Sequence, residues 1–254
     1  MTNKSAGTFT DSLSSFTQYE ARELIQICKN GRLYPFSDVE AYFPEITHRA
    51  IEIAGMPYSF KSTLILHNTV QLRRNRIKAD YIKERVSLIN KRLFPAHYSI
   101  TLANKTIEEL LAMTKDQVYL LDRGTYDQIA FLYTYKKFGF IDQQTFESAS
   151  DYLTRFGTNK ISGVIICQSK PEDCLKQEGV RNTPGFVMNY DFLRGLYESY
   201  KALPKLITET RARCGLGTEP FPVIYLERSI SWDECSSLFL QSTTTLLKLN
   251  MYNL

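Results

Sequence analysis

The sequence has few of the residues that build metal centres and disulfide frameworks. It contains three histidines and one tryptophan, and its five cysteines form no C-x-x-C pair. Zinc modules and disulfide scaffolds need such residues in larger numbers and at fixed spacings. We therefore expect neither, and we expect reduced, mostly buried thiols in a cytoplasmic protein.

Long apolar runs and a strong charge excess are also missing. No segment has the roughly 20 consecutive apolar residues of a membrane helix, and the N-terminus has no signal-peptide hydrophobic region. The formal net charge is only +4, from 31 Lys and Arg against 27 Asp and Glu. We expect no membrane partner, and this small surplus does not favour nucleic acid as a partner.

The 254 residues are 43% hydrophobic, with 16 Tyr and 15 Phe, enough apolar material for one sizeable core. Residues 1–47 read as a Ser- and Thr-rich flexible tail followed by a helical extension. Residues 48–254 read as one domain in which apolar strands alternate with helices. The predicted strands are residues 48–54, 85–88, 117–121, 161–167 and 221–226. The predicted helices are residues 62–82, 107–113, 126–138, 146–156, 171–177, 190–203 and one that begins near Ser231.

This alternation predicts an α/β fold with a five-stranded, mostly parallel sheet flanked by helices on both faces. Two helix starts carry local signals: Thr125 and Gln128 form a capping-box pattern, and Ser231 and Glu234 form another. In folds of this kind ligands bind at the carboxyl ends of the strands. The residues that follow each strand are therefore the candidates for chemistry.

A phosphate-loop pattern follows the first predicted strand and precedes a helix. The pattern is G-x-x-x-x-G-K-[ST], and the segment GMPYSFKST at residues 55–63 matches it except at Phe60, which replaces a glycine. Backbone N–H groups at such a helix start bind phosphate oxygens. The candidate binding residues are Gly55, Ser59, Phe60, Lys61, Ser62 and Thr63.

Within this loop we expect Lys61 to reach the outer phosphates and Ser62 to hold Mg²⁺. Phe60 leaves two interpretations open, because glycine normally lets the backbone approach the phosphates. Either the loop is an eroded site, or the ring points away and packs on Tyr58 or the first helix. The retained Lys61 and Ser62 favour a functional loop.

Charged residues also follow the second and third predicted strands. Asp122 and Arg123 come directly after residues 117–121, where a carboxylate can hold or orient Mg²⁺ and an arginine can bind phosphate. After residues 85–88 the chain has Asn90, Lys91 and Arg92. These two cations suit an anionic acceptor that is already phosphorylated, although a solvated loop is the plainer interpretation.

The order of four segments resembles the thymidylate kinase and deoxynucleoside kinase branch of the P-loop kinases. The segments are GMPYSFKST, LLDRGTYDQIAF, GVIICQSKPEDCLKQ and FPVIYLE, and the resemblance spans about residues 48–245. It implies ATP and Mg²⁺ as cofactors, with Lys61, Asp122 and Arg123 in catalysis and Ser62 and Asp122 at the metal. It also implies a cationic lid over the transferred group. Gln177 stands where a lid arginine is common, which leaves Lys176 and Arg181 beside Lys91 and Arg92 as substrate or lid candidates.

Many nucleoside kinases of this branch use an acidic residue after the second strand as a base, and none follows residues 85–88 here. The resemblance implies an ATP-dependent phosphotransferase acting on a nucleotide, a nucleoside or a similar small molecule. One alternative is a non-catalytic or weakly hydrolytic P-loop protein that binds nucleotide or a partner. A nucleic-acid-end kinase is a second, suggested by the basic residues between Arg73 and Lys78. A homodimer is one of the oligomeric states that the sequence leaves open.

Overall fold

The structure is a computed structural model that describes residues 50–84, 95–114, 117–157, 161–177, 189–218, 221–227 and 231–249. The predicted N-terminal unit, residues 1–47, lies outside these ranges. The predicted strand at residues 85–88 also lies outside them, as do Lys91, Arg92 and Arg181.

Five parallel strands form a single sheet in the order β2-β3-β1-β4-β5. The strands are β1 (Ala50–Gly55), β2 (Ala79–Ile82), β3 (Val118–Asp122), β4 (Ile161–Gln168) and β5 (Val223–Glu227). The three central strands are buried along their whole length, as expected for a parallel sheet covered on both faces. The predicted fold class is therefore confirmed.

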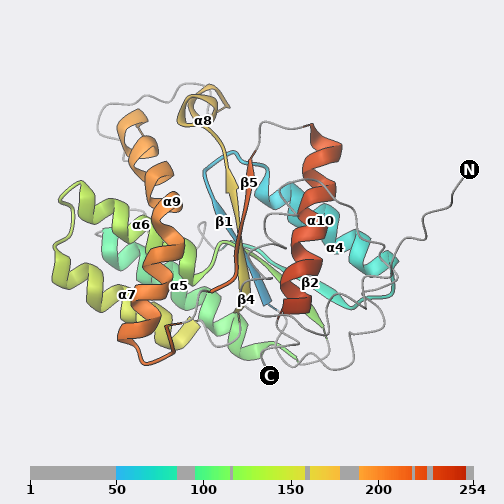
Figure 1. Cartoon of the computed structure of the whole chain (residues 1–254), viewed down its shortest axis with the longest axis horizontal. Coiled ribbons are helices and arrows are strands. Elements are labelled where there is room, and N and C mark those ends of the chain that lie inside the picture. Colours follow the sequence, from blue (N-terminus) through green and yellow to red (C-terminus); the bar gives the residue numbers. More distant parts are fainter. Residues whose placement is uncertain are drawn as a thin grey trace, which may run out of the picture.

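Among the described helices, one pair packs on one face of this sheet and a second group lies on the opposite side (Figure 1). The first pair is α4 (Lys61–Arg74) and α10 (Trp232–Leu249). The opposite group is α5 (Pro95–Ala112), α6 (Thr125–Lys137), α7 (Gln143–Gly157) and α9 (Tyr190–Arg213), while the short α8 (Pro171–Gln177) lies beyond the end of β4. All strands run parallel, so their carboxyl ends meet at one edge of the sheet.

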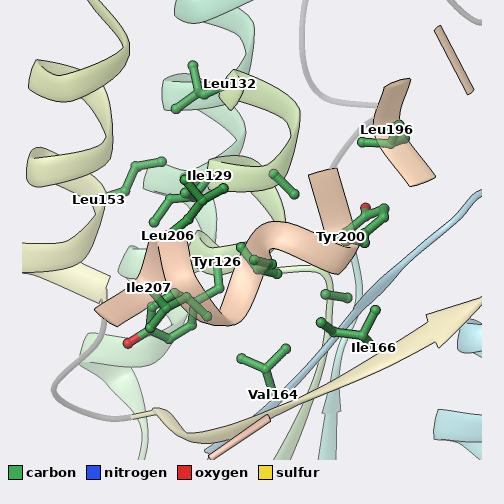
Figure 2. Packing of buried hydrophobic residues seen from close by; sticks show 14 of the residues in the cluster. Tyr126, Ile129, Leu132, Leu153, Val164, Ile166, Leu196, Tyr200, Leu206 and Ile207 are labelled. Atoms are coloured by element: carbon green, nitrogen blue, oxygen red, sulfur yellow. The ribbon is translucent and has the colours of Figure 1, made fainter. Parts of the chain in front are cut away.

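The alternation of side chains along β1 divides the core into two parts. Ile51 and Ile53 face α4 and α10, whereas Ala50 and Ala54 face α6 and α9. The second part is the larger, and Figure 2 shows residues of α6, α7, α9 and β4 pointing into it. Glu52, between these alanines, is a fully buried carboxylate.

The second strand is not where the sequence analysis placed it. The predicted helix over residues 62–82 ends at Arg74, and Ala79–Ile82 at its predicted end form β2. Arg76 terminates the helix in the left-handed conformation, with φ 62°. Its N–H bonds to Arg73 O, and the next N–H, of Ile77, bonds to Leu72 O. This is a Schellman-type ending with arginine at the usual glycine position.

The prediction for α9 ended at residue 203 because Pro204 follows. The helix continues through Pro204 to Arg213. Its later turns bury Leu206 and Ile207. This apolar burial outweighs the backbone hydrogen bond that the proline lacks.

Candidate functional site

The loop between β1 and α4 begins at Gly55, which lies tightly against β4. Gly55 has φ +132°, and a Cβ there would lie 2.1 Å from the Cys167 carbonyl oxygen. Only glycine fits this position, because the neighbouring strand leaves no room for a side chain and φ is positive. The N–H of Met56 donates to the same Cys167 oxygen at 3.1 Å. β4 thus fixes the start of the loop.

Lys61, the first residue of α4, is buried beneath the loop. Its Nζ donates to Gly55 O at 3.1 Å, to Met56 O at 2.6 Å and to Ser59 Oγ at 3.3 Å. Burial lowers the pKa of Lys61 to about 8, and the nearby Arg123 guanidinium acts in the same direction. An amine held this way sits at the centre of the loop with its charge poorly solvated, which suits it to an anionic ligand.

Phe60 adopts the left-handed backbone conformation, in which glycine is the usual residue. Its φ and ψ are 61° and 12°, and its carbonyl oxygen begins the helical hydrogen bonds of α4 by accepting from Leu64 N at 2.9 Å. The side chain is 41% exposed. The ring meets the Trp232 ring edge-on, with centroids 6.0 Å apart, so α10 supplies a packing partner that the sequence analysis did not foresee.

Asp122 at the end of β3 lies against the start of α4. The hydroxyl of Ser62 donates to Asp122 Oδ2, and the Tyr81 hydroxyl donates to the same oxygen at 2.9 Å. Two predicted site residues, Ser62 and Asp122, are therefore in direct contact although 60 positions separate them. Tyr81, on β2, was not predicted as a site residue.

Arg123 binds two carboxylates in the buried part of the site. Its Nε lies 3.3 Å from Glu84 Oε1, and its Nη1 lies 2.8 Å from Asp127 Oδ2 and 3.3 Å from the Tyr200 hydroxyl. Burial lowers the pKa of Arg123, but the Asp127 and Glu84 carboxylates more than offset this effect and raise the pKa above its usual value. Arg123 therefore carries its charge at any physiological pH.

The position of Glu84 shows that the sequence analysis was wrong about the residues that follow the second strand. Because β2 is Ala79–Ile82, the residues that follow the second strand are Lys83 and Glu84 and not Asn90, Lys91 and Arg92. An acidic residue does occupy this position, and the case for an already phosphorylated acceptor loses its basis. Burial raises the pKa of Glu84, and Arg123 opposes that rise.

Asp127 connects the loop to the acidic and basic residues at the strand ends. Its Oδ1 accepts from Gly55 N at 3.1 Å and from the Tyr200 hydroxyl at 2.7 Å, while its Oδ2 pairs with Arg123. The side chain is fully buried. The sequence analysis missed Asp127 and Tyr200, although Asp127 lies in a segment that carried the resemblance.

Glu52, on β1, holds the first turn of α6 and therefore Asp127 in place. Its carboxylate accepts from Tyr126 N at 3.1 Å and from Asp127 N at 2.6 Å, at the start of α6. The helix N-cap is Gly124, which makes no side-chain cap bond, so the predicted capping box of Thr125 and Gln128 is wrong. Glu52 caps the helix start in its place, because it accepts from these two backbone N–H groups. A Cβ on Gly124 would lie only 2.4 Å from the carboxylate, so glycine leaves room for it.

Replacing Glu52 by glutamine is expected to flatten the dependence of stability on pH. Burial raises the pKa of Glu52 to about 8, and Asp127 adds to the rise. The unfolded chain releases this proton near 4.5, so rising pH destabilises the wild type between about 4.5 and 8 and has no further effect through Glu52 above that. The loss is on the order of 5 kcal/mol.

Denaturant unfolding at pH 5, 6.5 and 8 measures this effect. The wild type should lose stability relative to Glu52→Gln across the series, whereas Glu108→Gln, at an exposed carboxylate of α5, should follow the wild type. A constant difference between wild type and Glu52→Gln at all three values contradicts the prediction.

The remaining predicted residues lie less centrally. Ser59 is buried and its hydroxyl donates to Met56 O at 2.8 Å, whereas Thr63 is exposed on the first turn of α4. Lys176 on α8 is 79% exposed and lies 3.8 Å from Asp173. The structure therefore brings Lys176 into no contact with Lys61, Asp122 or Arg123.

The oxygen atoms of Ser62 and Asp122 form a pair that fits a magnesium ion. Mg²⁺ prefers oxygen ligands and usually takes one or two from protein while phosphates and water supply the rest. Among the described residues no group of three or more His, Cys, Asp and Glu side chains forms a complete metal site. Two protein oxygen ligands fit a Mg²⁺ ion whose other ligands are phosphate and water.

The fold itself occurs in solved structures. The structure of deoxyadenosine kinase from M. mycoides with bound dATP matches with a TM-score of 0.50 and 15% identity, over 82% of this chain and 100% of that one. The chain has a deoxynucleoside kinase fold. The same enzyme with bound dCTP matches with a TM-score of 0.49 and 14% identity, over 80% of this chain and 97% of that one.

No protein-family model matches the sequence, and no curated protein is similar to it. The likeness to this kinase fold therefore rests on the arrangement of the elements and not on the residues. Within the part of the chain that the structure describes, no helix is both long and apolar enough to cross a bilayer.

Proposed function

We propose that the protein is an ATP-dependent phosphotransferase whose acceptor is a nucleoside or a similar small molecule with a free hydroxyl. The observation that carries the proposal is the position of two consecutive residues, Asp122 and Arg123. Asp122 contacts Ser62 of the phosphate loop, and Arg123 pairs with Glu84. The loop therefore meets an ion pair between buried Arg123 and partly exposed Glu84 at one point, as transfer between a donor and an acceptor requires.

On the donor side, Lys61 and the loop N–H groups would hold the ATP phosphates. Gly55 lets the loop begin tightly against β4, and the Lys61 charge would neutralise the outer phosphates. Ser62 and Asp122 would hold Mg²⁺, which when bound supplies charge neutralisation of the transferring group.

On the acceptor side, Glu84 would accept the proton of the acceptor hydroxyl. As that oxygen forms its bond to the transferred phosphorus, the bond to the donor's leaving oxygen breaks. Arg123 would orient Glu84 and place a positive charge beside the transferred group. The raised pKa of Glu84 brings its proton affinity closer to neutral pH, which favours a general base. A carboxylate here also suits a neutral hydroxyl better than a phosphorylated acceptor.

A thermal-shift panel tests the proposal most directly. ATP, GTP and deoxynucleoside triphosphates, each with Mg²⁺ or with EDTA, are compared with and without added nucleosides. At 100 times Kd a ligand stabilises by about 2.7 kcal/mol, a rise in Tm of roughly 5–10 °C for a chain of this size. We expect such a rise with Mg–ATP and a smaller one with EDTA.

Transfer is then measured as ADP release and as phosphorylated nucleoside by mass spectrometry. A rise in Tm that depends on Mg²⁺, together with phosphorylated nucleoside as product, supports the proposal. Absence of any nucleotide shift rejects it and favours the non-catalytic interaction protein. A shift with oligonucleotides alone favours the nucleic-acid-end kinase.

A further inference from the structure

Phe60, Trp232 and His67 form an aromatic contact between α4 and α10. The Trp232 ring meets the Phe60 ring and the His67 ring edge-on, each with centroids 6.0 Å apart. Phe60 and His67 are seven residues apart, about two helical turns, so they lie on the same side of α4. Trp232, at the start of α10, bridges them.

Hydrogen bonds of His67 join α4 to the first turn of α10, where Trp232 lies. The His67 Nδ1 lies 2.8 Å from Ser236 Oγ, one helical turn after Trp232, and the His67 Nε2 lies 3.4 Å from Gln71 Nε2. The Ser236 hydroxyl is buried. These contacts fix the first turn of α10 against the middle of α4, which leaves the Trp232 ring directed at the loop end of the helix.

The loop residue that this ring contacts is under conformational strain. Phe60 has φ 61°, a region that side-chain-bearing residues avoid because Cβ crowds the following carbonyl oxygen. Tyr58, two residues earlier, has φ 57°. A loop with glycine at position 60 adopts this geometry without help, whereas phenylalanine needs contacts that hold it there.

We propose that Trp232 is a positioning residue for the phosphate loop. Its ring holds Phe60 in the left-handed conformation and so replaces, with a side-chain contact, the conformational freedom that glycine provides in other phosphate loops. The loop N–H groups then keep their inward direction despite the missing glycine. This inference rests on the proposed function only in that it treats residues 55–63 as a phosphate site.

A double-mutant cycle tests the proposal without any ligand. Amide hydrogen exchange of the loop is measured in the wild type, Trp232→Leu, Phe60→Gly and the double variant. In the wild-type background Trp232→Leu should speed exchange of the amides of Tyr58, Ser59 and Phe60 about fivefold to thirtyfold, the population change expected when left-handed phenylalanine loses its support. In the Phe60→Gly background the same change should have less than about a twofold effect.

Two further variants separate positioning from general packing. Trp232→Phe keeps a ring and should restore slow loop exchange, whereas Leu66→Ala, at an exposed position of α4, should not change it. Trp232 is the only tryptophan, so acrylamide quenching of its fluorescence should increase in Phe60→Gly. Denaturant unfolding of each variant confirms that the domain remains folded.

An equal effect of Trp232→Leu in both backgrounds, or no effect in either, overturns the proposal. The Kd for Mg–ATP should follow the same cycle, with weaker binding in Trp232→Leu and near-normal binding in the double variant. If the wild type binds no nucleotide while the exchange cycle behaves as expected, the proposed function fails and the role of Trp232 stands.

Discussion

Lys61→Ala is expected to lower phosphoryl transfer and nucleotide affinity by at least about a hundredfold. Lys61 is the one described cation inside the loop, where its Nζ is surrounded by Gly55 O, Met56 O and Ser59 Oγ. Its removal leaves the donor phosphates facing carbonyl oxygens without a compensating charge. Initial rates and calorimetric Kd values for Mg–ATP measure the loss.

The fold should survive this change, because removal of a buried, desolvated amine offsets much of the lost hydrogen bonding. Lys105→Ala is the matched control, since Lys105 is an exposed lysine on α5 that pairs with Glu108. Wild-type affinity should also weaken as pH rises through about 8, where Lys61 loses its proton. Undiminished activity of Lys61→Ala would eliminate the proposed donor site.

Glu84→Gln is expected to lower kcat by about 100-fold to 10,000-fold with little change in KM for either substrate. Glutamine keeps the shape of the side chain and an oxygen for Arg123 but cannot accept the acceptor's proton. In the wild type, activity should increase as pH rises through the pKa of Glu84, because only the carboxylate is active. The variant should lack this rise.

The pH–rate profile distinguishes a base from a merely structural carboxylate. Glu108→Gln serves as the control at an exposed position. Loss of activity in Glu84→Gln with the rising limb of the profile intact would assign the base elsewhere. If Glu84→Gln raises KM for the acceptor and leaves kcat unchanged, Glu84 is a binding residue and not the base.

The sequence predicted one half of this candidate site because the loop and the β3 end carry their signals locally. Lys61 and Ser62 come after a buried strand and are the first residues of a helix. Asp122 and Arg123 lie at the end of β3 and directly after it. The parallel arrangement of β1 and β3 then brings Ser62 and Asp122 together. Local pattern and parallel topology were sufficient for this half of the site.

Glu84 was missed because the end of α4 carries no local signal. Its left-handed terminal residue is Arg76, where sequence rules look for glycine, so the helical pattern runs on into β2. The buried hydrogen bonds of Asp127 could also not be predicted from the sequence. Its partners Gly55, Tyr200 and the capping Glu52 come from β1 and α9, and only tertiary packing brings them within hydrogen-bond distance.

The contact between Glu52 and Gly124 has a consequence for recognising diverged relatives of this chain. A Cβ at position 124 would lie 2.4 Å from the Glu52 carboxylate, so a side chain at position 124 requires the Glu52 side chain to shift or to be shorter. In a relative with a side chain at position 124 we expect a shorter residue at position 52 and a different cap for the helix. Paired substitution of these two positions, 72 residues apart in the sequence, is the covariation that this contact predicts.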